Sequence, residues 1–552
     1  MMKTIAKQLM VIYLIFVVIK IFLSFSSLTL SIYSDEYVYL KLAQSISEGS
    51  YTIHGILSNA YPPLYSLLIA PAQFLTSTQW SYIVTKIINV LISTAIIFPS
   101  FFILKKFLTE KQSMLGASIA TLHPSVFAFT PYIMSENLFY TLVLCTILLM
   151  INAIKTQKIS LHMLTGMALG AVFLTRTLGL LFIPVYMVAQ LVHMIRNEKR
   201  ITKKHIINLI ITIGLASILI VSWMAYNLSF SSEKPLGAYT QEAMPPDLKF
   251  LPQIALWVML YAAVLIISTA MIFPAAMYVF IKNVKTEEGK IMATIMVAAL
   301  ILFIIAGANH SIHSNIKSSL TWILGRPIGR YIDTLAVPVL LTGFIGLMRG
   351  EKRKIVKPMI GCSLLALASV SILMHFSIGP VNNISLTFFE GLKRMADGVN
   401  VATPSFITLS LGVVIMAIWA IYLIRTQQKK ACIAIAVMFF IMTSGATLAG
   451  TYYNTSVWND HPQVQLSKWI DENIQQEKKI IVDKEDCIAG DMKEKKKKLC
   501  HPEGHTAIIG TWIRNPIRIS DDIYKGDYLL TSSKKNLTLV EENAQIFLYA
   551  TK

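Results

Sequence analysis

Apolar runs of about 20 residues recur along most of this chain, and they constrain its fold more than any other feature of the sequence. A run of that length crosses a bilayer as a helix, in which every backbone hydrogen bond is satisfied internally. Hydrophobic residues make up 55% of the 552 residues and charged residues only 14%, too few to cover a soluble protein of this size. The sequence therefore predicts a polytopic α-helical membrane protein.

The net charge of +19 comes mainly from basic residues in short gaps between the apolar runs. The positive-inside rule expects this distribution in cytoplasmic loops, so the charge indicates a lipid bilayer and no nucleic acid as partner. All the gaps can face the cytoplasm if two helices lie between successive gaps. They are Lys105–Lys111, Lys155–Lys158, Arg196–Lys204, Lys282–Lys290, Arg349–Lys357 and Arg425–Lys430.

The run that follows Lys3 and Lys7 is too long for a signal peptide, and we interpret it as an uncleaved first helix that ends near Leu30. Further runs fit between the basic gaps, at 81–104, 112–130, 137–154, 160–176, 178–195, 206–225, 253–281, 291–308, 330–348, 358–377, 404–424 and 431–450. The sequence thus predicts about thirteen spans, with the N-terminus in the cytoplasm and the C-terminus outside.

The long loops lie on the predicted outer side, at 31–80, 226–252, 309–329 and 378–403, whereas the cytoplasmic gaps are turns. Functional residues concentrate on long loops, so we expect the working face to be extracytoplasmic. The predicted transmembrane domain is 1–450, including the long first outer loop 31–80.

From Thr451 the composition changes, and residues 451–552 predict a small extracytoplasmic α/β domain. An amphipathic helix is expected at 465–476, because its apolar residues have helical spacing. Strands are expected at 479–483, 506–510, 527–531 and 545–551.

Two of the five cysteines, Cys487 and Cys500, lie in this outer domain, where a disulfide can persist. A disulfide is the first interpretation. Zinc is the alternative, because CHPEGH adds His501 and His505, although the spacing is not that of a standard zinc finger. The other cysteines fall in predicted spans: Cys145, Cys362 and Cys432.

The stretch SDEYVYLKLAQSISEG, which follows the first span, predicts an amphipathic helix on the outer membrane surface. Its polar face is expected to hold Lys41, Gln44, Ser45 and Glu48. Asp35 and Glu36 fall in the first turn, where carboxylates suit the helix dipole. Capping needs only one polar side chain, which Ser34 supplies, so the acidic pair is a candidate for chemistry. The segment 64–75 that follows YPPL is too short to span a bilayer and predicts a re-entrant or surface helix.

Four isolated charges lie in or beside spans, all toward the predicted outer side: Lys86, Glu136, Arg176 and Arg330. A charge at membrane depth costs about 2.5–3.5 kcal/mol on insertion scales, so it usually has a partner or a function. Each one alone could be an interfacial side chain that reaches water. Together with the acidic pair, they predict a pocket that holds a phosphate and a polar substrate beside lipid.

The order of these motifs resembles the GT-C superfamily of integral-membrane glycosyltransferases. The motifs are the acidic pair, YPPL, VTKIINVL with Lys86, LTRTLGLLFIP with Arg176, and GRYIDTLAVP with Arg330 and Tyr331. Within the superfamily, the chain is similar to the branch of protein O-mannosyltransferases and lipid A aminoarabinose transferases. It departs from that branch at SWMAYN, where Tyr226 stands in place of an arginine that relatives often carry.

The resemblance implies a transferase that moves a sugar from a polyprenyl-phosphate donor to a protein, lipid or glycan acceptor. It implies Asp35 and Glu36 as catalytic residues, and Lys86, Glu136, Arg176, Arg330 and Tyr331 as substrate-binding residues. No metal site is assigned, and a divalent cation stays an alternative for the acidic pair. The rival functions are a multi-pass transporter or lipid flippase, and a non-catalytic scaffold.

Overall fold

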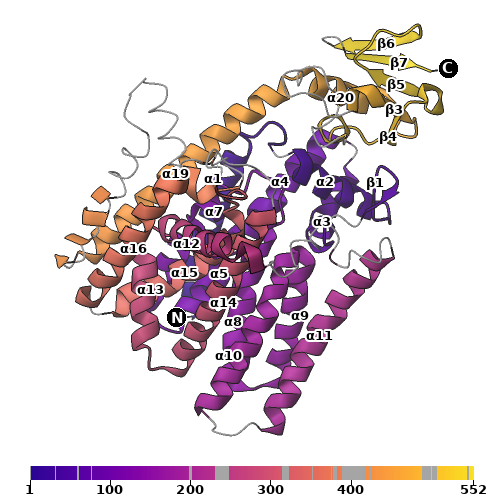
Figure 1. Cartoon of the computed structure of the whole chain (residues 1–552). Coiled ribbons are helices and arrows are strands. Elements are labelled where there is room, and N and C mark those ends of the chain that lie inside the picture. Colours follow the sequence, from indigo (N-terminus) through magenta and orange to yellow (C-terminus); the bar gives the residue numbers. More distant parts are fainter. Residues whose placement is uncertain are drawn as a thin grey trace. The chain divides into compact units, whose positions relative to one another are not determined.

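The computed structural model confirms a polytopic helical protein (Figure 1). It describes residues 2–31, 33–58, 61–75, 77–197, 202–229, 248–313, 322–350, 352–373, 382–387, 428–487, 506–543 and 546–551, with a few isolated positions between them. Within these residues, nine helical stretches are long and apolar enough to cross a membrane: Ile5–Ser24, Thr78–Lys105, Glu136–Thr156, Thr177–Arg196, Lys203–Leu228, Leu251–Ser268, Glu287–His313, Arg330–Arg349 and Lys429–Asn459.

The chain forms two compact units. Unit 1 consists of Met1–Lys20, Leu91–Phe129 and Glu136–Ala449. Unit 2 consists of Ile21–Val90, Thr130–Ser135 and Gly450–Lys552. Three helices pass from one unit to the other along the chain: α1 (Met2–Ser24), α4 (Thr78–Thr94) and α19 (Lys429–Asn459).

The remaining helices of unit 1 follow in chain order. They are α5 (Ile97–Lys105), α6 (Glu110–Thr121), α7 (Pro124–Phe127), α8 (Glu136–Thr156), α9 (Ile159–Thr175), η2 (Thr177–Leu181), α10 (Phe182–Asn197), α11 (Lys203–Leu228), α12 (Leu251–Ser268), α13 (Ile272–Asn283), α14 (Glu287–His313), α15 (Arg330–Arg349), α16 (Lys352–Leu373) and η5 (Ile384–Leu386).

Helix α15 is the most buried of the candidate spans in unit 1, and α13 packs closely along it. Two glycines allow this approach. A Cβ atom at Gly343 would lie 2.2 Å from the carbonyl oxygen of Phe273, and one at Gly346 would lie 2.1 Å from that of Ala276. Any larger side chain at either position would push the two helices apart.

Two expected spans are interrupted. The run 253–281 is two helices, because α12 ends at Ser268 and α13 begins at Ile272, with φ of 56° at both Ala270 and Met271. Pro274 has no N–H to donate to the preceding turn, which favours a break at this point. The run 112–130 breaks at His123, whose extended backbone is the conformation expected before a proline. The run 404–424 lies mostly outside the described residues, so the count of thirteen spans stays a prediction.

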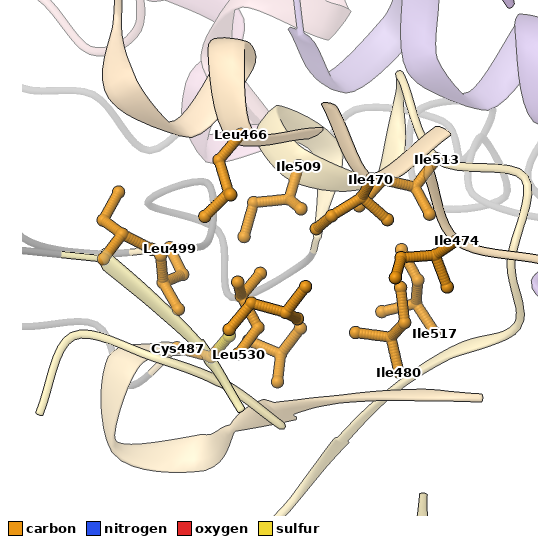
Figure 2. Packing of buried hydrophobic residues seen from close by; sticks show 13 residues of the cluster. Leu466, Ile470, Ile474, Ile480, Cys487, Leu499, Ile509, Ile513, Ile517 and Leu530 are labelled. Carbon is orange, nitrogen blue, oxygen red and sulfur yellow. The ribbon is translucent and has the colours of Figure 1, made fainter. Parts of the chain in front are cut away.

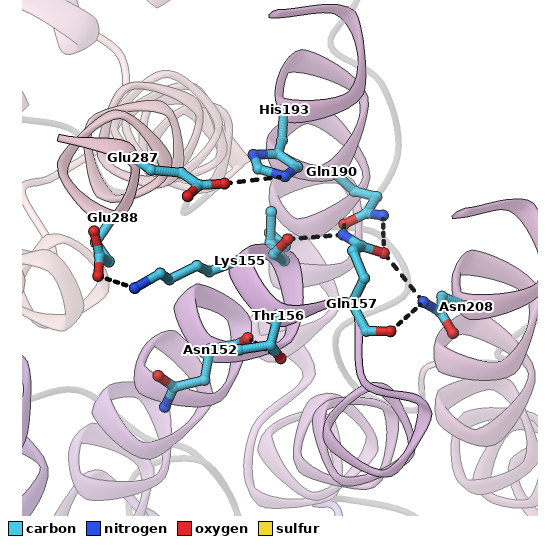
Figure 3. A network of polar contacts seen from close by, with 10 residues as sticks. Asn152, Lys155, Thr156, Gln157, Gln190, His193, Asn208, Glu287 and Glu288 are labelled. Atoms are coloured by element: carbon cyan, nitrogen blue, oxygen red, sulfur yellow. Dashed lines mark hydrogen bonds and ion pairs between the residues drawn. The ribbon is translucent and has the colours of Figure 1, made fainter. Parts of the chain in front are cut away.

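A polar network joins α8, α10, α11 and α14 at the ends that carry the basic gaps (Figure 3). Gln157 and Gln190 exchange hydrogen bonds of 3.3 Å, and Asn208 donates to Gln157 at 3.1 Å. Lys155 pairs with Glu288 beside them. We call this end of unit 1 the basic end. Buried amides are stable here because their hydrogen-bonding groups find partners in neighbouring helices.

Unit 2 begins with the first loop: α2 (Tyr33–Ser47), the hairpin β1 (Thr52–Ile53) and β2 (Ile56–Leu57), α3 (Leu64–Ile69) and η1 (Ala70–Phe74). Helix α2 is followed by Gly49, whose φ of +80° suits a glycine at the end of a helix. Leu64–Phe74 is too short to span a bilayer, as the sequence predicted.

The C-terminal part of unit 2 is α/β, as expected. Its elements are α20 (Pro462–Asn473), β3 (Ile480–Asp483), α21 (Ala507–Gly510), β4 (Ile517–Ser520), β5 (Tyr528–Thr531), β6 (Thr538–Asn543) and β7 (Ile546–Ala550). The strand order is β4-β3-β5-β7-β6; β3 is parallel to β4 and β5, and β7 is antiparallel to β5 and β6.

Alternate residues of the strands form a core on each face of this sheet. On one face, Leu466 and Ile470 of α20 pack against Ile480 and Leu530 (Figure 2). On the other face, Ile481 and Leu529 pack with Phe547 and Tyr549.

The structure corrects two expectations in unit 2 and supports a third. Residues 506–510 were expected as a strand but form α21, because a short apolar run does not distinguish helix from strand by its periodicity. Lys41 and Ser45, expected on an exposed face of α2, are buried. Cys487 is disulfide-bonded. It is therefore no thiolate ligand for the zinc alternative, whose Cys500, His501 and His505 lie outside the described residues.

Helix α2 is buried on its polar side because the C-terminal segment packs against it. Tyr37 hydroxyl and Thr506 hydroxyl lie 3.1 Å apart, and Lys41 Nζ donates to the carbonyl of Ile513 at 2.7 Å. Burial lowers the pKa of Lys41 from 10.5 to about 7, and nearby Arg514 adds to this effect, while Asp471 and Glu48 oppose it. The first loop and the C-terminal segment thus belong to one body.

Lys41→Met should flatten the pH dependence of stability. The unfolded lysine keeps its proton up to about pH 10, whereas the folded one loses it near pH 7, so the unfolded state binds more protons in this window. Wild-type stability should therefore rise from about pH 7 to about pH 10. We would measure thermal unfolding midpoints of the full-length protein in detergent.

The matched control is Lys525→Met, because Lys525 lies in the same unit but is exposed. It should keep the wild-type slope. If stability depended on pH in the same way in all three proteins, folding would not lower the pKa of Lys41.

Candidate active site

The acidic pair lies in unit 2, in the first turn of α2. Asp35 is partly exposed and accepts a hydrogen bond of 2.8 Å from the hydroxyl of Tyr61, which follows the hairpin. The Tyr61 ring stacks on Tyr39 with centroids 4.8 Å apart. The Asp35 carboxylate is therefore oriented by a packed tyrosine while it stays accessible.

Glu36 is placed differently from its neighbour, because its side chain is only 1% exposed. Its two oxygens accept from the backbone N–H groups of Ser31, at 2.8 Å, and Ile133, at 2.7 Å. These bonds fasten the end of the first span and the short segment Thr130–Ser135 to the start of α2. Such charge-assisted bonds to backbone N–H groups are among the stronger hydrogen bonds in proteins.

Lys86 also lies in unit 2, on α4, with its side chain 2% exposed. Its Nζ donates to the carbonyl of Ser27 and lies 4.6 Å from the ring centroid of Tyr82. One turn further along α4, Asn89 accepts from the hydroxyl of Tyr65 at 2.9 Å and donates to the carbonyl of Tyr132 at 3.1 Å. Asn89, Tyr65 and Tyr132 were not predicted, because nothing in the sequence distinguishes them from other polar or aromatic residues.

The second group lies in unit 1, where Glu136 is the first residue of α8 and is fully buried. It forms an ion pair with Arg176, and the closest nitrogen of Arg330 lies 4.0 Å from its carboxylate. We call these three residues the arginine–glutamate cluster. It contains two guanidinium groups and one carboxylate, and the side chains of Glu136 and Arg176 are buried.

Backbone geometry fixes the position of each arginine. Arg176 ends α9 in an extended conformation, with φ −151° and ψ 136°, which turns the chain into η2. Arg330 begins α15, and its backbone N–H donates to the carbonyl of Asn382 at 2.9 Å. Asn383 accepts from Gly329 N–H at 2.8 Å and donates to the carbonyl of Pro327 at 3.2 Å. The loop before α15 is therefore tied to the segment 382–387.

Aromatic rings surround the cluster. The Arg176 guanidinium lies 5.6 Å from the ring centroid of Tyr331 and 5.9 Å from that of Phe139, both within cation–π range. The ring of His310, on α14, lies 4.3 Å from that of Tyr331. The Arg176 guanidinium thus lies among aromatic side chains, and guanidinium groups are the side chains best suited to planar or tetrahedral anions.

The structure therefore divides the predicted site residues into two groups. It brings together Glu136, Arg176, Arg330 and Tyr331 in unit 1, and it places Asp35, Glu36 and Lys86 in unit 2. Across the described ranges, no three His, Cys, Asp or Glu side chains converge as metal ligands would. Asn383 and His310 were not predicted, since an isolated Asn or His in a long loop or helix gives no sequence signal.

Known proteins resemble this chain in part of its sequence and in its fold. Residues 60–223 match the family model described as dolichyl-phosphate-mannose-protein mannosyltransferase. No curated protein sequence matches the chain.

Two solved structures of ArnT from Cupriavidus metallidurans share the fold. The apo structure has a TM-score of 0.56 and 12% identity, and the match covers 99% of this chain and 98% of ArnT. The structure bound to undecaprenyl phosphate has a TM-score of 0.57 and 12% identity, and the match covers 98% of both chains. The chain thus shares the fold of ArnT, and its residues 60–223 match the mannosyltransferase family model.

Proposed function

We propose that this protein transfers a sugar from a polyprenyl-phosphate-linked donor to an acceptor at the outer membrane face. The observation that carries the proposal is the arginine–glutamate cluster, a largely buried site with two guanidinium groups at the ends of α8, α9 and α15. A phosphate that departs from a sugar needs such a site, because the leaving group gains negative charge in the transition state.

The donor phosphate is assigned to Arg176 and Arg330. Arginine suits this task because its planar guanidinium donates two parallel hydrogen bonds to phosphate oxygens. Glu136 pairs with both guanidinium groups, more closely with Arg176 than with Arg330. The Arg330 side chain is 17% exposed, which leaves it more accessible to a ligand than Arg176, at 8%.

Asp35 is assigned as the general base. It takes the proton from the acceptor hydroxyl, whose oxygen then forms the new bond to the anomeric carbon. The bond from that carbon to the phosphate oxygen breaks, and polyprenyl phosphate leaves with the electron pair. One displacement of this kind inverts the configuration at the anomeric carbon. The hydrogen bond from Tyr61 orients the carboxylate for this step.

Glu36 is proposed as a positioning residue, because both its oxygens accept from backbone N–H groups. Lys86 is proposed to contribute to binding the donor. A divalent cation held by the acidic pair stays an alternative to the assignment of Asp35 as the general base. The orientation with the C-terminal part outside rests on the basic gaps, which lie at the end of unit 1 opposite Glu136 and Arg330.

Asp35→Asn should strongly lower the rate of transfer while leaving the fold intact. A general base contributes about 10²–10⁴ to the rate, so the loss should fall in that range. We would add radiolabelled polyprenyl-phosphate sugars, one at a time, to membranes with cell extract as acceptor. The readout is label that leaves the lipid fraction.

Tyr61→Phe is the matched control, because it keeps the ring and removes only the hydroxyl that orients Asp35. It should lower the rate by about tenfold or less. Equal transfer by wild type and Asp35→Asn would remove Asp35 from the mechanism. Failure of every donor, in an assay where a known GT-C enzyme works, would favour a transporter or flippase.

Glu136→Gln should make the ligand-free protein less stable but more responsive to polyprenyl phosphate. Removing one partner of a buried ion pair costs about 3–5 kcal/mol, because the opposite charge is left uncompensated. A bound phosphate would restore the balance of charge. We would compare unfolding midpoints with and without undecaprenyl phosphate.

Glu287→Gln serves as the control, since Glu287 is partly exposed at the basic end and lies 3.7 Å from His193. It should respond to undecaprenyl phosphate as the wild type does. If undecaprenyl phosphate raised the unfolding midpoint of Glu136→Gln no more than that of the wild type, the phosphate would have to bind elsewhere.

A further inference from the structure

A ligand-sized groove lies in unit 1, far along the helices from the arginine–glutamate cluster. It is a groove of about 880 Å³ between α13 and α16, bordered by one residue of α12. We call it the α13–α16 groove. It lies toward the C-terminal end of α13 and the N-terminal half of α16. Arg330 begins α15 at the other end of the unit, and that helix of 20 residues is about 30 Å long.

The groove combines positive charge with apolar surface. Three exposed lysines line it, Lys282 on α13 and Lys354 and Lys357 on α16. Its walls are largely apolar and include Ile266, Val279 and Leu365 from three different helices. A soluble anion would use the lysines but not the walls. An amphiphile with an anionic head and acyl chains would use both.

The groove also has room for a chain beside α16. Gly361 lines it, and a Cβ atom at this glycine would meet no other atom within 4 Å. Pro358 lies one turn before Gly361, and the side chain of Tyr278 is 54% exposed on the α13 side. These features leave an open apolar path beside α16.

We propose that the α13–α16 groove binds an anionic glycerophospholipid of the cytoplasmic leaflet. The lysines come from the gaps that the positive-inside rule places in the cytoplasm, where anionic lipids attract basic residues. The phosphate of the lipid contacts Lys282, Lys354 and Lys357, and its acyl chains lie along Ile266, Val279 and Leu365. The polyprenyl phosphate of the proposed reaction is a different ligand, because its phosphate is assigned to Arg176 and Arg330.

Native mass spectrometry of the full-length protein released from detergent tests this inference. The probes are dioleoyl phosphatidylglycerol, dioleoyl phosphatidylcholine and undecaprenyl phosphate at equal concentration. The wild type should retain phosphatidylglycerol in preference to phosphatidylcholine. Each lysine near a phosphate contributes about 1 kcal/mol, which is roughly fivefold in affinity. The combined variant Lys282→Gln, Lys354→Gln, Lys357→Gln should therefore lose at least tenfold of this preference.

The matched control is Lys158→Gln, Lys203→Gln, Lys204→Gln, which removes three lysines from another groove of unit 1. It should keep the preference for phosphatidylglycerol. An equal loss in both triple variants would show a general effect of charge and overturn the proposal. So would an absence of any preference in the wild type, or lysine-dependent binding of undecaprenyl phosphate in place of phosphatidylglycerol.

A second pair of variants tests the groove without changing charge. Gly361→Trp should fill the apolar path and weaken phosphatidylglycerol binding. Gly214→Trp, at an open position on α11, should not, because a Cβ atom there also meets nothing within 4 Å. Undiminished binding by Gly361→Trp would contradict the proposal. Undecaprenyl phosphate binding should be unchanged in both, which separates this inference from the proposed transferase reaction.

Discussion

The ion pair between Glu136 and Arg176, with Arg330 beside it, is the interaction on which the proposed chemistry depends. It joins the first residue of α8, the residue that ends α9 and the first residue of α15. Burying these charges is costly unless each has a partner, so the three helix ends must meet at one point. The same arrangement brings two guanidinium groups together at this point. The same side chains thus pair buried charges with one another and provide the proposed phosphate site.

Unit 2 holds the Asp35 carboxylate in place at the start of the first loop. Glu36 fastens the start of α2 through the N–H groups of Ser31 and Ile133, and Tyr61 orients Asp35. The C-terminal segment covers the other side of α2 through Lys41 and Ile513. A loop that carries a proposed catalytic residue gains rigidity from these contacts. This gives the C-terminal segment a structural role, whatever acceptor the protein uses.

The helical membrane fold was predictable because the length of the apolar runs and the positions of the basic gaps can be found in the sequence without knowledge of tertiary contacts. The closeness of Glu136 and Arg176 was expected only in outline, since the two residues lie 40 positions apart. The break at Ala270, the helix α21 and the burial of Lys41 were not predicted, because each depends on packing partners distant in sequence. Residues such as Asn383, which hold the loop before α15, gave no signal for the same reason. The division of the chain at residue 450 and the roles of the site residues stay predictions.

A structure of the protein with bound undecaprenyl phosphate would test the central claim most directly. The account predicts that the phosphate lies within hydrogen-bond distance of the guanidinium groups of Arg176 and Arg330, with Glu136 displaced from at least one of them. A phosphate bound at Lys282, Lys354 and Lys357, or one that leaves the Glu136–Arg176 pair untouched, would contradict it.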